Sequence, residues 1–285
     1  MSKVDNERVG DSMRGDGITL GLDWGGTTTS AVAMDRNDGT MKFLEGVTIP
    51  STGDSVSEAT QKILDSLTSP AHVVGLTGIG ATSMPKSGYL LSIPYRKVDE
   101  ATATGLGGCL LAGVGEALVV SIGTGTSFVS VRKKHIERFG GTGVGGGCLL
   151  GLAKRLLDVD NVSDIDLLAA RGDLHQVDLS VGDLAGDSYG GLMGDLTAAN
   201  LAKQGAKKED IALGLMNLVA ETIVVMSVFA SRACGLERVL LTGNVTLIKK
   251  LVGLMMERST LFGPTFLVPP HAEYATAIGA AIGVS

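Results

Sequence analysis

Two short glycine-rich segments, each between two runs of β-forming residues, constrain the fold of this 285-residue chain more than any other feature. The first is GLDWGGTTTSAVAMD at 21–35, and the second is SIGTGTSFVSV at 121–131. Glycine and threonine in this position predict a hairpin turn whose backbone is uncovered and whose edges carry hydroxyl groups. A chain that repeats such a hairpin is expected to contain two similar folding units.

The predicted elements around the two hairpins also repeat in order. The first set comprises strands at 18–22, 30–34 and 41–49 and a helix at 54–67; the second comprises strands at 117–122, 127–131 and 135–139 and a helix after GGTGVGGG. Other strands are predicted at 72–78, 93–98, 238–243 and 265–269, and other helices at 99–118, 244–257 and 274–283, with helical patterns dominating 145–234. This duplication predicts an α/β fold of two lobes that face each other across a cleft.

The predicted division of the chain has three parts. Residues 1–16 are polar and are expected to form a flexible tail. Residues 17–115 form the first lobe and residues 116–285 the second, with the C-terminal helix able to pack back on the first lobe. A length of 285 residues suits two lobes of ordinary size.

Composition excludes several classes of partner. The net charge is −6, and no basic tract exceeds the short RKK at 132–134, so no nucleic-acid partner is expected. The three cysteines, Cys109, Cys148 and Cys234, are far apart and lack metal-binding spacing. We therefore expect small core residues in a reducing compartment, with no disulfide framework and no zinc site.

The most apolar stretch, at 211–232, contains Asn217 and Glu221. These polar residues favour a buried helix over a membrane span, and no signal-peptide pattern opens the sequence. The prediction is a cytoplasmic protein without a membrane partner.

The glycine turns have the chemistry of a phosphate site. Bare backbone lets phosphate oxygens approach N–H groups, and threonine hydroxyls add donors without charge. Asp23 supplies a carboxylate of the kind that holds Mg²⁺, here through water. Gly145–Gly147 precede a helix whose N-terminus attracts anions, and LLTGN at 240–244 places Gly243 and Asn244 where a nucleoside could pass.

Taken together, these segments resemble a known family. DWGGTTTS, IGTGTS and TGN before a helix are similar to the actin, hexokinase and Hsp70 ATPase superfamily. VDEATATGLGG, RFGGTGVGGGCLLGLAKRL and GDLTAAN narrow the resemblance to type II pantothenate kinases. The resemblance implies a two-lobed actin-like fold related to ribonuclease H, a homodimer, and ATP-dependent phosphorylation of pantothenate to 4′-phosphopantothenate at the first committed step toward coenzyme A.

The resemblance also implies residue roles. Glu100 matches the catalytic glutamate of an E-x-x-A-x-x-x-G pattern and is the expected general base, with Asp99 as the alternative. Arg138 matches an arginine near pantothenate and the transferred phosphate. Asp195 in GDLTAAN is expected to cap a helix from Leu196. The nucleotide is assigned to Asp23, Gly25, Gly26, Thr27, Thr28, Ser30, Gly123, Thr124, Gly125, Thr126, Gly145, Gly146, Gly147, Gly243 and Asn244, with Mg²⁺ on Asp23.

One position departs from the family pattern. Ser30 stands where the pattern G-G-T-x-x-K has lysine, so a positive charge near the phosphates is missing. Phosphate binding is then expected to depend on hydroxyls, magnesium and Arg138. Three alternatives stay open: a superfamily kinase for pantetheine or an amino sugar, an ATPase that activates acyl-CoA dehydratases, and a nucleotide-binding regulator without turnover.

Overall fold

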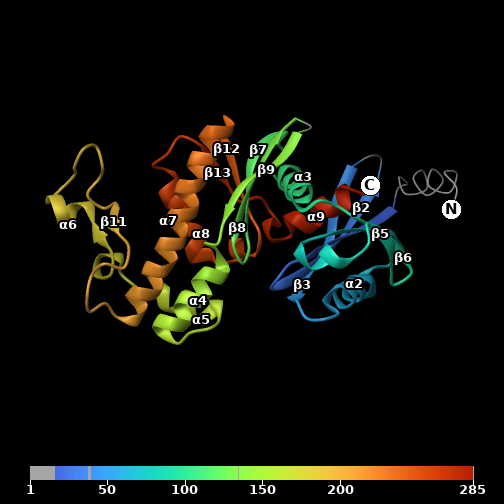
Figure 1. Ribbon diagram of the computed structural model, residues 1–285, viewed down its shortest axis with the longest axis horizontal. Helices are drawn as coiled ribbons and strands as arrows, with labels where there is room; N and C mark the ends of the chain where they lie inside the picture. Colours follow the sequence, from blue (N-terminus) through green and yellow to red (C-terminus); the bar gives the residue numbers. More distant parts are fainter. Residues whose placement is uncertain (1–16, 38–39, 134, 285) are drawn as a thin grey trace.

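A computed structural model describes residues 17–37, 40–133 and 135–284, which form two sheets arranged along the long axis of the molecule (Figure 1). The tail predicted at 1–16 lies outside the described residues. The first sheet has the order β3-β2-β1-β4-β6-β5, with β1 Gly17–Trp24, β2 Thr28–Asn37, β3 Thr40–Pro50, β4 Ala71–Thr77, β5 Ser87–Leu90 and β6 Ile93–Lys97. The second has the order β13-β12-β7-β8-β9, with β7 Glu116–Ile122, β8 Thr126–Arg132, β9 His135–Thr142, β12 Arg238–Thr242 and β13 Thr265–Leu267.

The described helices surround these sheets. They are α2 Ser55–Ser66, α3 Glu100–Ala112, α4 Gly146–Leu157, α5 Val162–Ala169, α6 Val181–Ala185, α7 Lys208–Cys234, α8 Lys249–Ser259 and α9 Ala275–Ile282. A small sheet pairs β10 Leu179–Ser180 with β11 Thr197–Ala199, and short 3₁₀ turns include η3 Asn244–Leu247 and η4 Ala272–Tyr274.

The two large sheets share one topology. In the first, β1, β2 and β3 form an antiparallel meander, and β4 and β6 run parallel to β1 on its other side. In the second, β7, β8 and β9 form the same meander, and β12 and β13 take the places of β4 and β6. The predicted internal duplication is confirmed, and β5 is an additional edge strand of the first sheet.

The duplication extends to the residue that leaves the central parallel strand. Gly78 follows β4 with φ 96°, and Gly243 follows β12 with φ 90°. A side chain at Gly78 would collide with the Trp24 carbonyl, and one at Gly243 would collide with the Ile122 carbonyl. Both positions therefore need glycine, because the chain turns closely over the neighbouring hairpin strand at a backbone angle that L side chains rarely adopt.

Helices α3 and α9 lie between the two sheets and join them (Figure 1). Helix α9 packs on β1 and β4, where Gly21 and Gly75 leave room for its backbone. Helix α3 packs on α9 and on the strands of the second sheet. The last helix of the chain thus covers the first sheet.

The core of the second sheet follows strand alternation. Leu118, Val120 and Ile122 of β7 belong to the large apolar cluster with α4, α5, α7 and α8, whereas Ala117 and Val119 belong to the cluster with α3. Successive side chains of a strand point to opposite faces, so this strand needs a helical layer on each side. Helix α7, long and apolar enough to pass a length-and-composition test for membrane spans, has 67% of its apolar window buried inside the protein.

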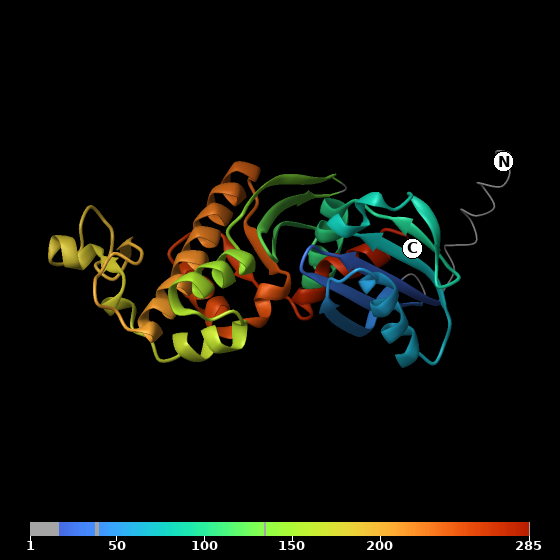
Figure 2. The same ribbon diagram turned by 60° about the horizontal axis from the view of Figure 1, so that its bottom comes forward.

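Two sequence expectations are wrong in detail, and a third is incomplete. The helix expected at 99–118 ends at Ala112, because Gly113 adopts a left-handed conformation with φ 63° and ends it. The pattern at 244–257 divides into η3 and α8. Helices dominate 145–234 as expected, but residues 170–207 form an excursion with β10, α6 and β11, which lies beyond α7 at one end of the molecule in both views (Figures 1 and 2).

Asp195 belongs to this excursion, and its predicted role is also wrong. No helix begins at Leu196; instead β11 follows, where Thr197 pairs with Ser180. The motif is held by a buried polar network, in which the Asn217 amide nitrogen of α7 lies 2.8 Å from the Asp178 carboxylate and 3.1 Å from the Thr197 hydroxyl. A β-branched threonine suits a paired strand, and tertiary hydrogen bonds decided the local conformation.

Candidate nucleotide and substrate cleft

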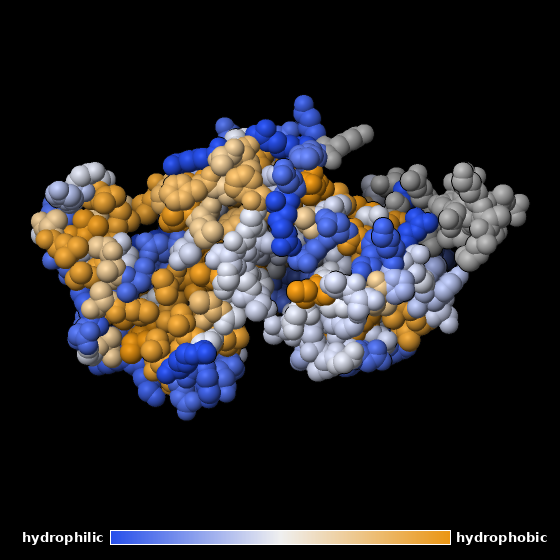
Figure 3. Space-filling view, in the orientation of Figure 1, coloured by the Kyte–Doolittle hydropathy of each residue, from blue (hydrophilic) through white to orange (hydrophobic). Residues whose placement is uncertain are grey.

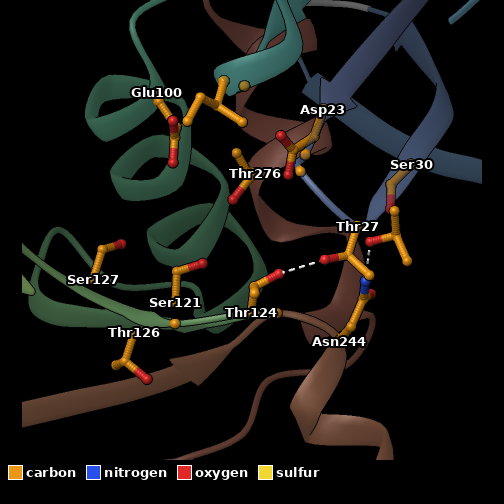
Figure 4. Close-up of a pocket in the computed structure, with 18 of the residues that line it drawn as sticks. Asp23, Thr27, Ser30, Glu100, Ser121, Thr124, Thr126, Ser127, Asn244 and Thr276 are labelled. Carbon is orange, nitrogen blue, oxygen red and sulfur yellow. Dashed lines mark hydrogen bonds between the residues drawn. The ribbon is translucent and has the colours of Figure 1, made fainter. Parts of the chain in front are cut away.

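A polar cavity of about 430 Å³ lies between the hairpins of the two large sheets. Residues from both halves of the chain line it (Figure 4). The predicted site residues on its wall are Asp23, Gly25, Gly26, Thr27, Thr28, Ser30, Glu100, Gly123, Thr124, Gly125, Thr126, Arg138, Gly243 and Asn244. Hydroxyls and backbone amides dominate this wall, which is the surface a polyphosphate requires.

The tips of the hairpins meet across the cleft. The hydroxyls of Thr27 and Thr124 are 2.8 Å apart, and the Asn244 amide donates to the Thr28 hydroxyl at 2.8 Å (Figure 4). The side-chain oxygen of Asn244 is buried and has no hydrogen-bond partner among the residues that the structure describes. The two lobes therefore bring the hydroxyls of both hairpins, which suit phosphate oxygens, to one place. The side-chain oxygen of Asn244 stands beside them as an acceptor that no described residue uses.

Each hairpin is supported from behind. The Ser51 hydroxyl donates to the Gly25 carbonyl at 2.7 Å in the first hairpin, and the Thr126 hydroxyl donates to the Val144 carbonyl at 2.7 Å in the second. The amides of Gly146 and Gly147 donate to the carbonyls of Gly123 and Thr124. These hydrogen bonds fix the shape of both turns.

The structure places Gly145–Gly147 behind the second hairpin and not on the cleft wall. A side chain at Gly145 would clash with the backbone of Gly125, so this glycine is needed for the close contact. The helix N-terminus expected to meet phosphate instead binds the carbonyls of the turn, and its contact with nucleotide stays a prediction.

Glu100 and Arg138 face each other on one side of the cleft. Glu100 is the first residue of α3, Arg138 lies on β9, and the guanidinium nitrogen is 3.4 Å from the Glu100 carboxylate. Both side chains remain about half exposed, at 44% and 53%. Asp99 is the N-cap of α3 and accepts hydrogen bonds from the amide and the hydroxyl of Thr102, so its carboxylate serves the helix while that of Glu100 is open to a ligand.

Asp23 lies at the end of β1, facing the same cavity. Burial first and the nearby Glu100 carboxylate second raise the pKa of Asp23 to about 7. Within the described residues its carboxylate accepts no side-chain hydrogen bond. A carboxylate that is desolvated, faces a second carboxylate and has no side-chain donor among the described residues is a group that a divalent cation would stabilise.

Ser30 is 5% exposed, and its hydroxyl lies 2.9 Å from that of Thr48 on the neighbouring strand β3. The side chain is thus tied into the sheet beneath the cleft. Of the described residues that line the cavity, Arg138 alone is basic, whereas Asp23, Glu100 and Glu273 are acidic. The missing lysine therefore leaves a cleft wall with an excess of negative charge.

The cleft contains residues that our sequence analysis did not select. They are Gly78, Ile79, Ser121, Ser127, Gly141, Thr142, Glu273 and Thr276. A signal for Gly78 was present, since LTG occurs both at 76–78 and at 241–243, where equivalent strands end. No local pattern indicated Glu273 or Thr276, because they reach the site only when α9 packs between the sheets.

Comparison with solved structures shows the fold class. Component A of (R)-2-hydroxyglutaryl-CoA dehydratase from Acidaminococcus fermentans superposes with a TM-score of 0.65 at 19% identity, over 93% of this chain and 96% of that one. The ROK hexokinase of Thermus thermophilus gives a TM-score of 0.56 at 17% identity, over 93% of this chain and 98% of that one. The chain has the two-lobed actin-like ATPase fold, and the predicted fold class is confirmed.

Sequence comparison then gives the family. A profile of the Fumble family matches residues 116–282. A type II pantothenate kinase from Oceanobacillus iheyensis is 31% identical over 223 residues, 74% of this chain and 82% of the relative, and one from Bacillus anthracis is 28% identical over 240 residues, 79% and 82%. The chain belongs to the Fumble family of type II pantothenate kinases, as the sequence motifs predicted.

Proposed function

We propose that this protein is a pantothenate kinase that uses ATP to convert pantothenate to 4′-phosphopantothenate. The observation that carries the proposal is the arrangement of one cleft in a Fumble-family chain. A base candidate, Glu100, and a guanidinium, Arg138, face the same cavity as two hydroxyl-rich hairpins from opposite lobes. Such a cavity can hold a triphosphate and an alcohol side by side, which an ATP-dependent kinase requires.

The triphosphate belongs between the hairpin tips. Thr27 and Thr124 lie within hydrogen-bonding distance of each other. Phosphate oxygens can therefore accept hydrogen bonds from hydroxyls of both lobes at once. Asn244, whose side-chain oxygen is unpaired within the described part of the chain, would accept a hydrogen bond from a nucleoside hydroxyl or amino group. Binding at these residues would hold the lobes together and keep water away from the reacting phosphate.

Magnesium fits the chemistry of Asp23. The carboxylate is a hard oxygen ligand with no competing side-chain hydrogen bond among the described residues, and its raised pKa shows that the ionised form is short of stabilisation. Bound Mg²⁺ would neutralise charge on the phosphates. Among the described residues of the cleft wall, one positive side chain, Arg138, stands beside three carboxylates, so the wall alone provides little neutralisation. Asp23 would hold the ion through water, as we predicted from its position before Gly25.

The chemical step assigns different work to the two groups near α3. Glu100 accepts the proton of the primary hydroxyl of pantothenate while the oxygen attacks the γ-phosphorus, and ADP leaves with the electron pair of the broken P–O bond. Arg138 binds the pantothenate carboxylate or the transferring phosphoryl group with its planar fork. The Arg138 guanidinium lies 3.4 Å from the Glu100 carboxylate, so an anionic substrate would compete with the base for it.

A substrate screen tests this proposal. ADP release is measured with Mg²⁺ and ATP in the presence of pantothenate, pantetheine or amino sugars, and the phosphorylated product is identified by mass. Pantothenate-dependent ADP release with one 4′-phosphopantothenate per ADP is the expected result. Faster turnover of pantetheine or an amino sugar would reassign the substrate, and ATP binding without any alcohol-dependent release would favour a regulator.

The surface of the second lobe supports a homodimer. Apolar side chains gather over this half of the visible face, whereas the first lobe is mostly polar there (Figure 3). Phe229 on α7 is 64% exposed, and Leu192 and Met193 of the excursion border a cavity of about 510 Å³ against α7 and α8. Exposed apolar area of this kind marks an interface, and light scattering would measure the mass.

The cellular setting and the lobe boundary complete the proposal. We place the protein in the cytoplasm, with neither membrane nor nucleic acid as partner, because α7 is largely buried and the net charge is −6. We divide the chain near residue 115, between α3 and β7, with α9 returning to the sheet of the first lobe. Limited proteolysis with nucleotide and without it would test that division.

A further inference from the structure

One residue of the cleft wall has no part in the scheme above. Thr276 lies in the first turn of α9 and is only 8% exposed, yet it lines the cavity. Figure 4 shows its side chain between those of Glu100 and Asp23. A neutral side chain with one proton to donate thus stands where two carboxylates approach each other.

The hydroxyl of Thr276 is fixed by a partner outside the cavity. It lies 3.1 Å from the hydroxyl of Thr104, which is 2% exposed and sits on α3 one turn after Glu100. Two hydroxyls bonded to each other use one proton, and the other proton remains free. Since Thr104 does not line the cavity, the group that can turn a proton toward a ligand is Thr276.

The helices that carry this pair are locked together. A side chain at Gly107 of α3 would collide with the Ala275 carbonyl of α9, and one at Gly279 of α9 would collide with the Ala103 carbonyl of α3. Their backbones are therefore in contact around Thr104 and Thr276. This contact fixes the Thr276 hydroxyl relative to Glu100, which begins the same helix α3.

We propose that Thr276 is a positioning residue for the alcohol substrate, an inference that rests on the proposed kinase function. Its hydroxyl donates a hydrogen bond to the oxygen of the attacking primary alcohol, while that alcohol donates its own proton to Glu100. In this chain of hydrogen bonds, Thr104 donates to Thr276, Thr276 donates to the alcohol, and the alcohol donates to the Glu100 carboxylate.

The chemistry of phosphoryl transfer permits such a donor at the nucleophile. The transition state is loose, so the rate depends little on the basicity of the attacking oxygen and strongly on its direction. Glu100 can take only one proton, and two contacts fix the alcohol better than one. Thr276 therefore acts on geometry, and its removal should lower kcat and leave ATP binding intact.

The test is a series at one position, followed by steady-state kinetics. Thr276→Val keeps the shape and removes the hydroxyl, and we expect kcat with pantothenate to fall about tenfold. Thr276→Ser keeps the hydroxyl and should stay within about threefold of the wild-type kcat. The matched control Thr104→Val should lower kcat about threefold, and the Kd of Mg-ATP should stay within about twofold in all variants.

The outcomes separate the inference from the proposed function. A wild-type protein without alcohol-dependent turnover overturns both. A wild-type protein that is active, with Thr276→Val within twofold of it or with Thr276→Ser as slow as Thr276→Val, overturns the positioning role alone. If Thr276→Val does not fold, Thr276→Ala replaces it, and serine rescue is judged against alanine by the same criteria.

Discussion

The two hairpins that meet across the cleft have equivalent strand pairing and different chemistry. Asp23 pairs with Ser30 just below the first turn, and Ser121 pairs with Ser127 just below the second. Asp23 and Ser121 therefore occupy corresponding places on the first strand of each meander, and all four residues line the cavity. One lobe carries a carboxylate where the other carries a hydroxyl.

This difference suggests how a duplicated fold becomes an asymmetric site. Both turns present hydroxyls and amides, so either suits phosphate oxygens, but a metal site is possible only where a carboxylate stands. The base and the guanidinium come from elements near the second sheet: α3, which packs on it, and β9, its edge strand. Asp23, the proposed cation ligand, thus comes from the first sheet, whereas Glu100 and Arg138 stand beside the second sheet.

The largest effect is expected at the base. Glu100→Gln removes the proton acceptor and retains the size of the side chain, so kcat should fall by about 10²-fold or more. The Kd of Mg-ATP should change little, because Glu100 faces the alcohol side of the cleft. Stopped-flow or coupled measurement of ADP release gives the rate, and a rate close to wild type would remove Glu100 from the mechanism.

The second prediction compares the same position in the two hairpins. Asp23→Asn should raise the Mg²⁺ concentration needed for half-maximal nucleotide binding by roughly tens of fold, whereas the matched variant Ser121→Ala should change it by less than about threefold. Burial and the Glu100 carboxylate destabilise the ionised form of Asp23. Asp23→Asn removes that charge and should also raise the Tm of the unliganded protein by roughly 2–4 °C. Equal sensitivity of the two hairpins would contradict the asymmetry.

The same carboxylate predicts a pH dependence with a definite sign. The pKa of Asp23 is raised from 3.8 to about 7, so the ionised form, to which we assign the cation, falls from most of the protein at pH 8 to a minority at pH 6. Mg-ATP affinity should drop about tenfold over that range. The unliganded protein should change in the opposite sense, losing stability as pH rises from about 4 to 7.

Calorimetric titration at pH 6, 7 and 8 measures this dependence. Asp23→Asn provides the control, because its affinity should be weak and nearly constant with pH. A wild-type affinity that is flat with pH, or that falls as pH rises, would show that Asp23 does not hold the cation.

The sequence predicted some parts of this site better than others. The hairpins, the central strands and their duplication follow from short-range patterns, because a glycine turn between two β-forming runs is determined by a few neighbouring residues. Glu100 and Arg138 were predicted by resemblance, and the structure places them 3.4 Å apart. In both cases the deciding signal lies within a few residues of the site.

The failures depended on distant contacts. GDLTAAN lacks a helix because Asp178 and Asn217 bind around it, and neither lies in the motif. Thr276 and Glu273 join the cleft because α9 inserts between two sheets, one built more than a hundred residues earlier in the chain. The sequence likewise does not show that the amides of Gly146 and Gly147 donate to the second hairpin, and the contact of Gly145–Gly147 with nucleotide stays a prediction.

The smallest predicted effect concerns the charge that the first hairpin lacks. Ser30→Lys would place an ammonium group at the position opposite Asp23, and we expect it to strengthen ATP binding in the absence of Mg²⁺ by about threefold. The gain is small because Ser30 is 5% exposed and bonded to Thr48, so a lysine must leave the sheet to reach the phosphates. Ser127→Lys, at the corresponding place in the second hairpin, is the matched variant. If Ser127→Lys strengthened metal-free ATP binding as much as Ser30→Lys, the missing positive charge would not be specific to the first hairpin, and this part of the comparison would fail.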